Sequence, residues 1–138
     1  EKVIEKSAKY ANIENEKGES PLHLAVLNEN VDIVEYLIES GADVDKKTKK
    51  GETPMHYASA YGCTNSIKIL LEKKANMNIK DEDGDTPLIL AVGNGNNDIA
   101  RLFKKRDAKS MNVVNNKGNS LLHIAAKYNN LEILNELL

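Results

Sequence analysis

Gly51-Glu-Thr-Pro-Met-His-Tyr-Ala58 is the stretch that decides the fold, because related octets occur at three other places in the chain. They are Gly18-Glu-Ser-Pro-Leu-His-Leu-Ala25, Gly84-Asp-Thr-Pro-Leu-Ile-Leu-Ala91 and Gly118-Asn-Ser-Leu-Leu-His-Ile-Ala125. The leading glycines are 33, 33 and 34 residues apart. A fixed period of this size predicts a stack of structural repeats instead of one globular core.

Each octet carries the residue types that begin a helix. The leading glycine allows a positive φ where the chain turns tightly. The hydroxyl two residues later can accept a hydrogen bond from the first turn of the helix. In the first three octets a proline follows, and it suits the first helical position because that position needs no N–H. We therefore expect four short helices, each followed by apolar residues that pack against its neighbours.

The pattern resembles the ankyrin repeat, through Thr53-Pro-Met-His56 and its counterparts on a period of 33 residues. The segment 31–45 agrees, since it is similar to the second helix of that family and to the Gly-Ala-Asp turn behind it. The resemblance covers essentially the whole chain. It implies an all-α repeat (α-solenoid) with short β-hairpin loops, in which each repeat has two antiparallel helices. It also implies binding to another protein, without catalysis.

On this basis residues 1–138 are predicted to form a single ankyrin-repeat domain. The predicted units are a partial repeat (1–17), three full repeats (18–50, 51–83 and 84–117) and a truncated repeat (118–138). Both ends are expected to have been cut from a longer array. Leu131, Ile133, Leu134, Leu137 and Leu138 lie on a last helix whose outer side would then lack a cover, and this predicts self-association through that helix.

Departures from the pattern in the first and third full repeats carry predictions of their own. Glu29 stands where the family has glycine between its helices, which predicts a strained turn. The third repeat has Ile89 in place of histidine, Gly93 near the end of its first helix, Lys104 at an apolar position and one added residue near Lys109. Glycine inside a helix costs about 1 kcal/mol relative to alanine. We expect the third repeat to be the softest of the internal repeats.

Composition excludes several classes of function. A net charge of −2 provides no basic field for nucleic acid or for an acidic membrane surface. No apolar run approaches the roughly 18 residues of a membrane span, and no signal peptide is visible. Cys63 is the only cysteine, so an internal disulfide is excluded. These features lead us to expect an intracellular, cytoplasmic protein.

The chain offers no convincing catalytic, cofactor or metal site. His23, His56 and His123 share one repeat slot, so stacking holds them roughly 10 Å apart per repeat, too far to share a metal ion. We expect them to hydrogen-bond to Ser or Thr at the neighbouring helix start. Cys63 has no histidine beside it in the sequence, and Gly93-Asn-Gly95 lacks the lysine of a phosphate loop.

The resemblance places partner binding on the loop tips and on the concave surface of the first helices. The second tip is basic and the third is acidic, which indicates either mutual attraction or a charge pattern that orients a partner. The predicted protein-binding residues are Tyr61, Tyr128, Lys47, Lys49, Lys50, Glu52, Glu82, Asp83, Asp85 and Asn94. Two alternatives remain open: a regulatory or targeting segment of a larger enzyme or secreted effector, and a self-associating scaffold.

Overall fold

The computed structural model describes residues 2–28 and 30–138, with side chains from Ser7 onward. The predicted strain at Glu29 lies outside the described residues. The helices are α1 (Lys2–Ala11), α2 (Pro21–Ala25), α3 (Val31–Glu39), α4 (Pro54–Tyr61), α5 (Thr64–Glu72), α6 (Pro87–Gly93), α7 (Asn97–Arg106), the 3-10 helix η1 (Ala108–Asn112), α8 (Leu121–Lys127) and α9 (Leu131–Leu137).

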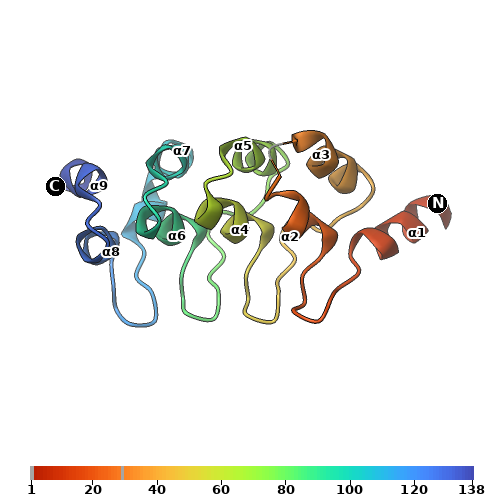
Figure 1. Cartoon of the computed structure of the whole chain (residues 1–138), viewed down its shortest axis with the longest axis horizontal. Helices are drawn as coiled ribbons and strands as arrows, with labels where there is room; N and C mark the ends of the chain where they lie inside the picture. Colours follow the sequence, from red (N-terminus) through yellow and green to blue (C-terminus); the bar gives the residue numbers. More distant parts are fainter. Residues whose placement is uncertain (1, 29) are drawn as a thin grey trace.

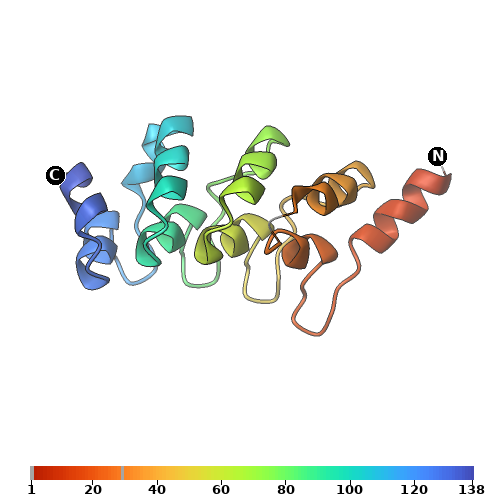
Figure 2. The same ribbon diagram turned by 45° about the horizontal axis from the view of Figure 1, so that its top comes forward.

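The helices form two rows that follow one another along the chain. Figure 1 shows the inner row of α2, α4, α6 and α8, the outer row of α3, α5, α7 and α9, and long loops that project from the inner row. The turned view in Figure 2 shows the same succession of helix pairs from the N-terminus to the C-terminus. Each inner helix packs against the next inner helix and against its own outer partner. The described part of the chain is therefore an all-α stack.

The inner helices begin as the octets predict. Ser20, Thr53, Thr86 and Ser120 are the N-caps, and each side chain accepts a hydrogen bond from the backbone N–H three residues later. Proline occupies the first helical position of α2, α4 and α6. In α8 this position is Leu121, which is buried. Burial of an apolar side chain replaces the conformational advantage of proline there.

The loops differ from the expected β-hairpins. Across the described residues no strand forms, and the only bridge of strand type is the isolated antiparallel pair Val114 and Ser120. Each loop is instead a tight turn closed by two backbone hydrogen bonds, such as those from Thr48 N to Glu52 O and from Gly51 N to Thr48 O, both at 2.9 Å. The two bonds share Thr48 and fix a turn, but they make no ladder.

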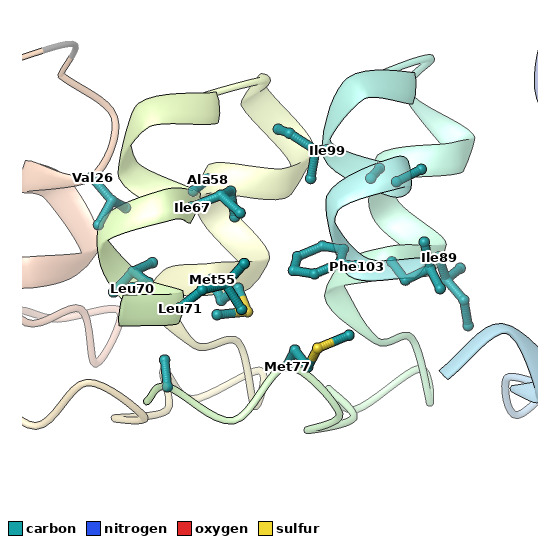
Figure 3. Close-up of a cluster of buried hydrophobic side chains, with 14 of the residues drawn as sticks. Val26, Met55, Ala58, Ile67, Leu70, Leu71, Met77, Ile89, Ile99 and Phe103 are labelled. Carbon is teal, nitrogen blue, oxygen red and sulfur yellow. The ribbon is translucent and has the colours of Figure 1, made fainter. Parts of the chain in front are cut away.

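The core runs along the stack between the two rows. Figure 3 shows Met55 and Ala58 of α4 near Ile67 and Leu70 of α5, with Phe103 of α7 farther along. All five side chains are almost completely buried. The core is continuous from Ala11 to Ile133, as expected of a repeat array in which each unit covers its neighbours.

Two non-glycine residues take over turns that glycine makes elsewhere. Lys74 stands in the slot of Gly41 and has φ +64°, and Asn129 stands in the slot of Gly62 and has φ +58°. The left-handed conformation costs roughly 1 kcal/mol or more for lysine, whereas asparagine tolerates it better. The second repeat therefore holds a mildly strained turn at Lys74.

The last helix corrects part of the sequence interpretation. Ile133 is buried and Leu134 and Leu137 are half-buried, so these three side chains pack inward. Of the five, only Leu131 and Leu138 are mostly exposed, at 62% and 87%.

Within the described residues, none of the helices combines the length and the apolar character that crossing a bilayer requires.

Candidate protein-binding surface

Four loop tips line one edge of the stack, and each is built around a polar first residue. We number them one to four, at residues 15–19, 48–52, 81–85 and 115–119. In the third tip, Asp81 Oδ1 accepts hydrogen bonds from Asp83 N at 3.0 Å and Asp85 N at 2.9 Å. Asn15, Thr48 and Asn115 accept the same pair of bonds in their tips. Asp81 is thus part of the loop framework.

Adjacent tips are joined backbone to backbone. Lys49 N donates to Lys17 O at 3.1 Å, Glu82 N donates to Lys50 O at 2.9 Å, and Asn116 N donates to Asp83 O at 3.0 Å. The approach is so close that a Cβ on Gly84 would lie 2.7 Å from Asn116 N. Glycine is required at this position both for the contact and for its φ of +77°.

Buried histidines join the inner helices to the next tip. The Nδ1 atom of His56 accepts a hydrogen bond from Thr53 N at 3.0 Å, so the proton of the neutral ring resides on Nε2. Nε2 then donates to Asp85 O at 2.8 Å, and His23 makes the matching bond to Glu52 O at 2.8 Å. Burial lowers the pKa of both histidines and favours this neutral form.

These contacts refine the expected role of the histidines. The Ser or Thr partner belongs to the histidine's own helix, and the neighbouring repeat supplies a backbone carbonyl instead of a hydroxyl. His123 keeps the contact with Ser120 but is exposed and has no carbonyl acceptor among the described residues. Ile89 occupies the slot in the third repeat and makes no such bond.

Two hollows lie in the corner between the tips and the inner helices. The first has a volume of about 740 Å³ and is lined mainly by Leu27, Lys49, Lys50, Tyr57 and Tyr61. The second has a volume of about 300 Å³, and its lining residues include Asp83, Asp85, Ile89, Gly93 and Tyr128. Asn94 lines both, so the hollows meet at the end of α6.

Gly93 lines the second hollow. A Cβ at this position would lie 3.5 Å from Ile124 Cγ2 and 3.7 Å from the Tyr128 ring. Both distances are ordinary van der Waals contacts, so the position has room for alanine and packing does not explain the glycine. Beside it, Lys127 Nζ lies 5.4 Å from the centroid of the Tyr128 ring.

Tyr57 and Glu19 are surface residues that the sequence interpretation did not select as the main site. Tyr57 Oη donates a hydrogen bond to Glu19 Oε2 at 2.6 Å, across 38 positions of sequence. The bond lowers the pKa of Glu19, while burial and then the same bond raise the pKa of Tyr57. The Tyr57 ring also meets the His23 ring edge-on, with centroids 5.1 Å apart. These contacts hold the Tyr57 side chain in one orientation, in which it lines the first hollow.

The predicted binding residues fall into two groups on this edge. Most are exposed, and Tyr61 is the most exposed aromatic residue of the inner helices, at 73%. Glu52 and Asp85 are half-buried, and burial is the main cause that raises the pKa of each carboxyl. The exposed members are Tyr61, Tyr128, Lys47, Lys49, Lys50, Glu82, Asp83 and Asn94.

The carboxylates of Asp81, Asp83 and Asp85 lie within 4.8 Å of one another. Asp81 is occupied by two backbone donors, and Asp85 accepts a hydrogen bond from Asn115 Nδ2 at 3.0 Å. Two of the three carboxylates therefore already accept hydrogen bonds from the protein. We assign this group a role in loop structure and not in binding a metal ion.

A family model for ankyrin repeats in three copies matches residues 2–81 and 73–138. The chain belongs to the ankyrin-repeat family. Comparison with curated proteins yields no match. Ankyrin repeats generally act as protein-protein interaction modules and are typically non-catalytic.

Proposed function

We propose that this ankyrin-repeat domain is a non-catalytic module that binds another protein, in an intracellular setting, along the loop tips and inner helices. The observation that carries the proposal is the first hollow, in which exposed Leu27 and Tyr61 lie beside lysines that have no ion-pair partner among the described residues. Exposed tyrosine next to charge is the usual composition of an interface hot spot.

The aromatic residues differ in how freely they can serve a partner. Tyr57 is held by Glu19 and His23, so it acts as a wall. Tyr61 ends α4 and is 73% exposed. Covering an exposed tyrosine removes a large amphipathic area from water at the cost of few rotatable bonds. Tyr61 is therefore our first choice as the anchor for a partner.

The test is a matched pair of substitutions. A partner is first isolated by pull-down with this chain, identified by mass spectrometry and purified. We expect Tyr61→Ala to weaken its binding by about 1–2 kcal/mol with little change in thermal stability. Tyr36→Ala is the control, because Tyr36 is 70% exposed but lies on α3 of the outer row. Equal dissociation constants for wild type and Tyr61→Ala would remove Tyr61 from the site.

Loss of binding in both tyrosine variants would point to the outer row as part of the interface. The alternative of a regulatory or targeting segment attached to an enzyme or effector has the same binding surface. The full reading frame decides between that alternative and an independent adaptor.

A second candidate function, self-association, is favoured by the apolar end of the last repeat. Leu131 and Leu138 are exposed, and a shallow hollow of about 560 Å³ lies between η1, the start of α8 and the end of α9. Light scattering at several concentrations tests this candidate. A mass that rises with concentration, and that Leu131→Glu/Leu138→Glu returns to the monomer value, is the expected result.

A further inference from the structure

We infer that the partner presents an extended segment with an acidic and a basic residue about three positions apart, the acidic one over tip two and the basic one over tip three. The inference rests on the proposed function and specifies the chemistry of the partner. It depends on which charges along the tips are already engaged by the protein itself.

Several charged side chains of this edge are occupied. Lys46 Nζ pairs with Glu14 at 3.2 Å, and Lys80 Nζ donates to Val114 O at 3.1 Å. Glu19 accepts from Tyr57 and from Asn15. Asp81 and Asp85 are the two carboxylates held within the third tip, as described above. These groups contribute little to an incoming partner because their hydrogen-bonding capacity is partly used.

The charges that remain free are divided by tip. Lys49 and Lys50 of tip two, Lys47 just before it, and Glu82 and Asp83 of tip three are exposed, and their side chains have no ion-pair or hydrogen-bond partner in the described structure. In tip one, the negative charge of Glu16 and the positive charge of Lys17 cancel. Tip four adds Lys117 alone. The carboxylate of Glu52, half-buried in tip two, offsets one of the lysines there. The free charge of the edge is therefore net positive at tip two and negative at tip three.

These opposite charges do not neutralise each other. Tips two and three are joined by the 2.9 Å bond from Glu82 N to Lys50 O, yet within the described residues no lysine of tip two lies within ion-pair distance of a carboxylate of tip three. The sequence allowed for attraction between these two tips, but over the described part of the chain the lysines of tip two and the carboxylates of tip three form no ion pairs with each other. Unpaired opposite charges on neighbouring tips give a partner an orientation as well as an attraction.

The two hollows supply a continuous bed between the charges. Lys49 and Lys50 line the first hollow and Asp83 lines the second, and Asn94 belongs to both. Each hollow also has an apolar lining residue that is not fully buried, Leu27 in the first and Leu90 in the second. An apolar side chain between the two charges of the partner would cover these two leucines.

The spacing follows from the geometry of the stack. Neighbouring helices pack about 8–10 Å apart, and an extended chain rises about 3.3 Å per residue. A segment that crosses from one tip to the next therefore advances by about three residues. Lys117 and Lys127 also line the second hollow, on the side away from tip two. They repel a basic residue of the partner there, so that residue is expected next to tip three.

The experiment uses a displayed library of random linear peptides selected on the wild-type chain. We expect enriched peptides to share an acidic and a basic residue about three positions apart. One enriched peptide, and the same peptide with those two charges exchanged, are then titrated against wild type and against Lys49→Glu/Lys50→Glu/Glu82→Lys/Asp83→Lys. This variant has the same net charge as wild type, so only the order of charges changes.

The expected result is a reversal of preference. The original peptide should lose roughly tenfold or more in affinity for the swapped chain, and the exchanged peptide should regain it. The control swap, which lies on exposed positions of the outer row, should leave both peptides unaffected; it is Glu39→Lys/Glu72→Lys/Lys73→Glu/Lys105→Glu. Circular dichroism verifies that each variant is folded. If the charge-swapped chain unfolds, the neutral variant Lys49→Gln/Lys50→Gln/Glu82→Gln/Asp83→Asn takes its place. This variant should bind the original peptide with lower affinity than wild type does.

Two other outcomes overturn the inference in different ways. Peptides that lose binding on Tyr61→Ala but do not respond to the charge swap would refute the charge order and leave the proposed function intact. If no peptide is enriched above the control on wild type, the interaction edge itself is wrong, and the inference falls with it.

Discussion

Three junctions join the successive repeats 18–50, 51–83, 84–117 and 118–138. At the first two, a histidine of an inner helix makes the polar link, whereas at the third the polar link lies between the outer helices α7 and α9. The buried His23 and His56 each donate a 2.8 Å bond to the carbonyl of the next tip. At the third junction Ile89 replaces the histidine, and within the described residues the matching carbonyl, Asn119 O, receives only the bond from Asn115 N of its own tip. The same stacking geometry thus survives without its internal polar link.

The third junction has an additional network on the outer row. Arg101 of α7 donates to Glu136 of α9 through Nε at 3.0 Å and contacts Glu132 through Nη2 at 2.5 Å. Asn97 and Asn130 exchange amide hydrogen bonds beside it, at 2.8 and 3.1 Å. The other junctions are linked on the outer row through backbone carbonyls instead of ion pairs. Ser66 donates to Val26 O at the first junction, and at the second Asn96 donates to Ser59 O and Ala60 O and Arg106 donates to Leu71 O.

The difference shows that one repeat period can be stabilised by two kinds of polar contact. A buried bond to a backbone carbonyl is insensitive to salt but depends on the protonation of histidine. Exposed ion pairs are insensitive to pH near neutrality and are weakened by salt. The junctions should therefore respond to different conditions.

Removing an internal link should give the largest effect. We expect His56→Ala to lower the free energy of unfolding by about 2–4 kcal/mol, because it empties a buried site and leaves Thr53 N without its acceptor. His123→Ala is the matched control, since it loses the cap contact but no junction bond, and about 1 kcal/mol or less is expected. Urea denaturation measures both. Equal losses would show that the bond to Asp85 O contributes nothing.

Acid should weaken the first two junctions selectively. Burial puts the folded-state pKa of His23 and His56 below the ordinary value of 6.5. The unfolded chain then binds more protons, so this stability is present above pH 6.5 and is lost as the pH falls through the folded-state pKa. The slope is at most about 1.4 kcal/mol per pH unit for each histidine.

Urea midpoints at several pH values between 7 and 5 test this, with His23→Asn/His56→Asn as the reference. Glu52 and Asp85 act in the opposite sense, because their pKa values are raised in the folded state. Their contribution is common to both proteins and cancels in the difference. A wild-type profile parallel to that of the reference would contradict the assignment.

Breaking the outer network should have a moderate effect that is confined to the end of the stack. Arg101→Met removes the contacts to Glu132 and Glu136. We expect amide exchange of α8 and α9 to accelerate severalfold at low salt, while exchange in α4 and α5 stays unchanged. High salt should reduce the difference between variant and wild type. Acceleration throughout the chain would mean that the network supports the whole stack instead.

Restoring the histidine at the third junction should change stability least. Ile89→His replaces buried apolar area but allows hydrogen bonds to Thr86 and to Asn119 O, so we expect a net change within about 1 kcal/mol. Ile67→His is the control, because Ile67 is fully buried and has no such partners, and it should cost well over 3 kcal/mol. Similar losses in both variants would show that the third junction has a different geometry.

Much of this architecture follows from short-range patterns in the sequence. The caps, prolines and apolar spacing of residues 18–25 determine where an inner helix begins, and they do so wherever they recur. The expected β-hairpins came from the resemblance alone. The structure forms tight turns instead, in which residues such as Thr48 satisfy two further loop amides with their side chains.

Contacts between repeats are harder to predict, because they join residues about one period apart whose types are individually unremarkable. The acceptor of His56 is a backbone carbonyl, which leaves no trace in the sequence. The attraction between Arg101 and Glu132 was in principle visible as opposite charges 31 positions apart. The contact between Tyr57 and Glu19 gives no such signal, since it depends on how closely a loop approaches the next helix.

In the described structure the backbone hydrogen bonds between tips all run in one direction: an N–H of the later tip donates to a carbonyl of the earlier one. The edge therefore has a polarity, with acceptors facing one terminus and donors facing the other. A two-fold axis would bring like ends together, so a symmetric dimer cannot extend this series of bonds. Copies that join through it must do so head to tail, and such growth closes into a ring or continues as a filament.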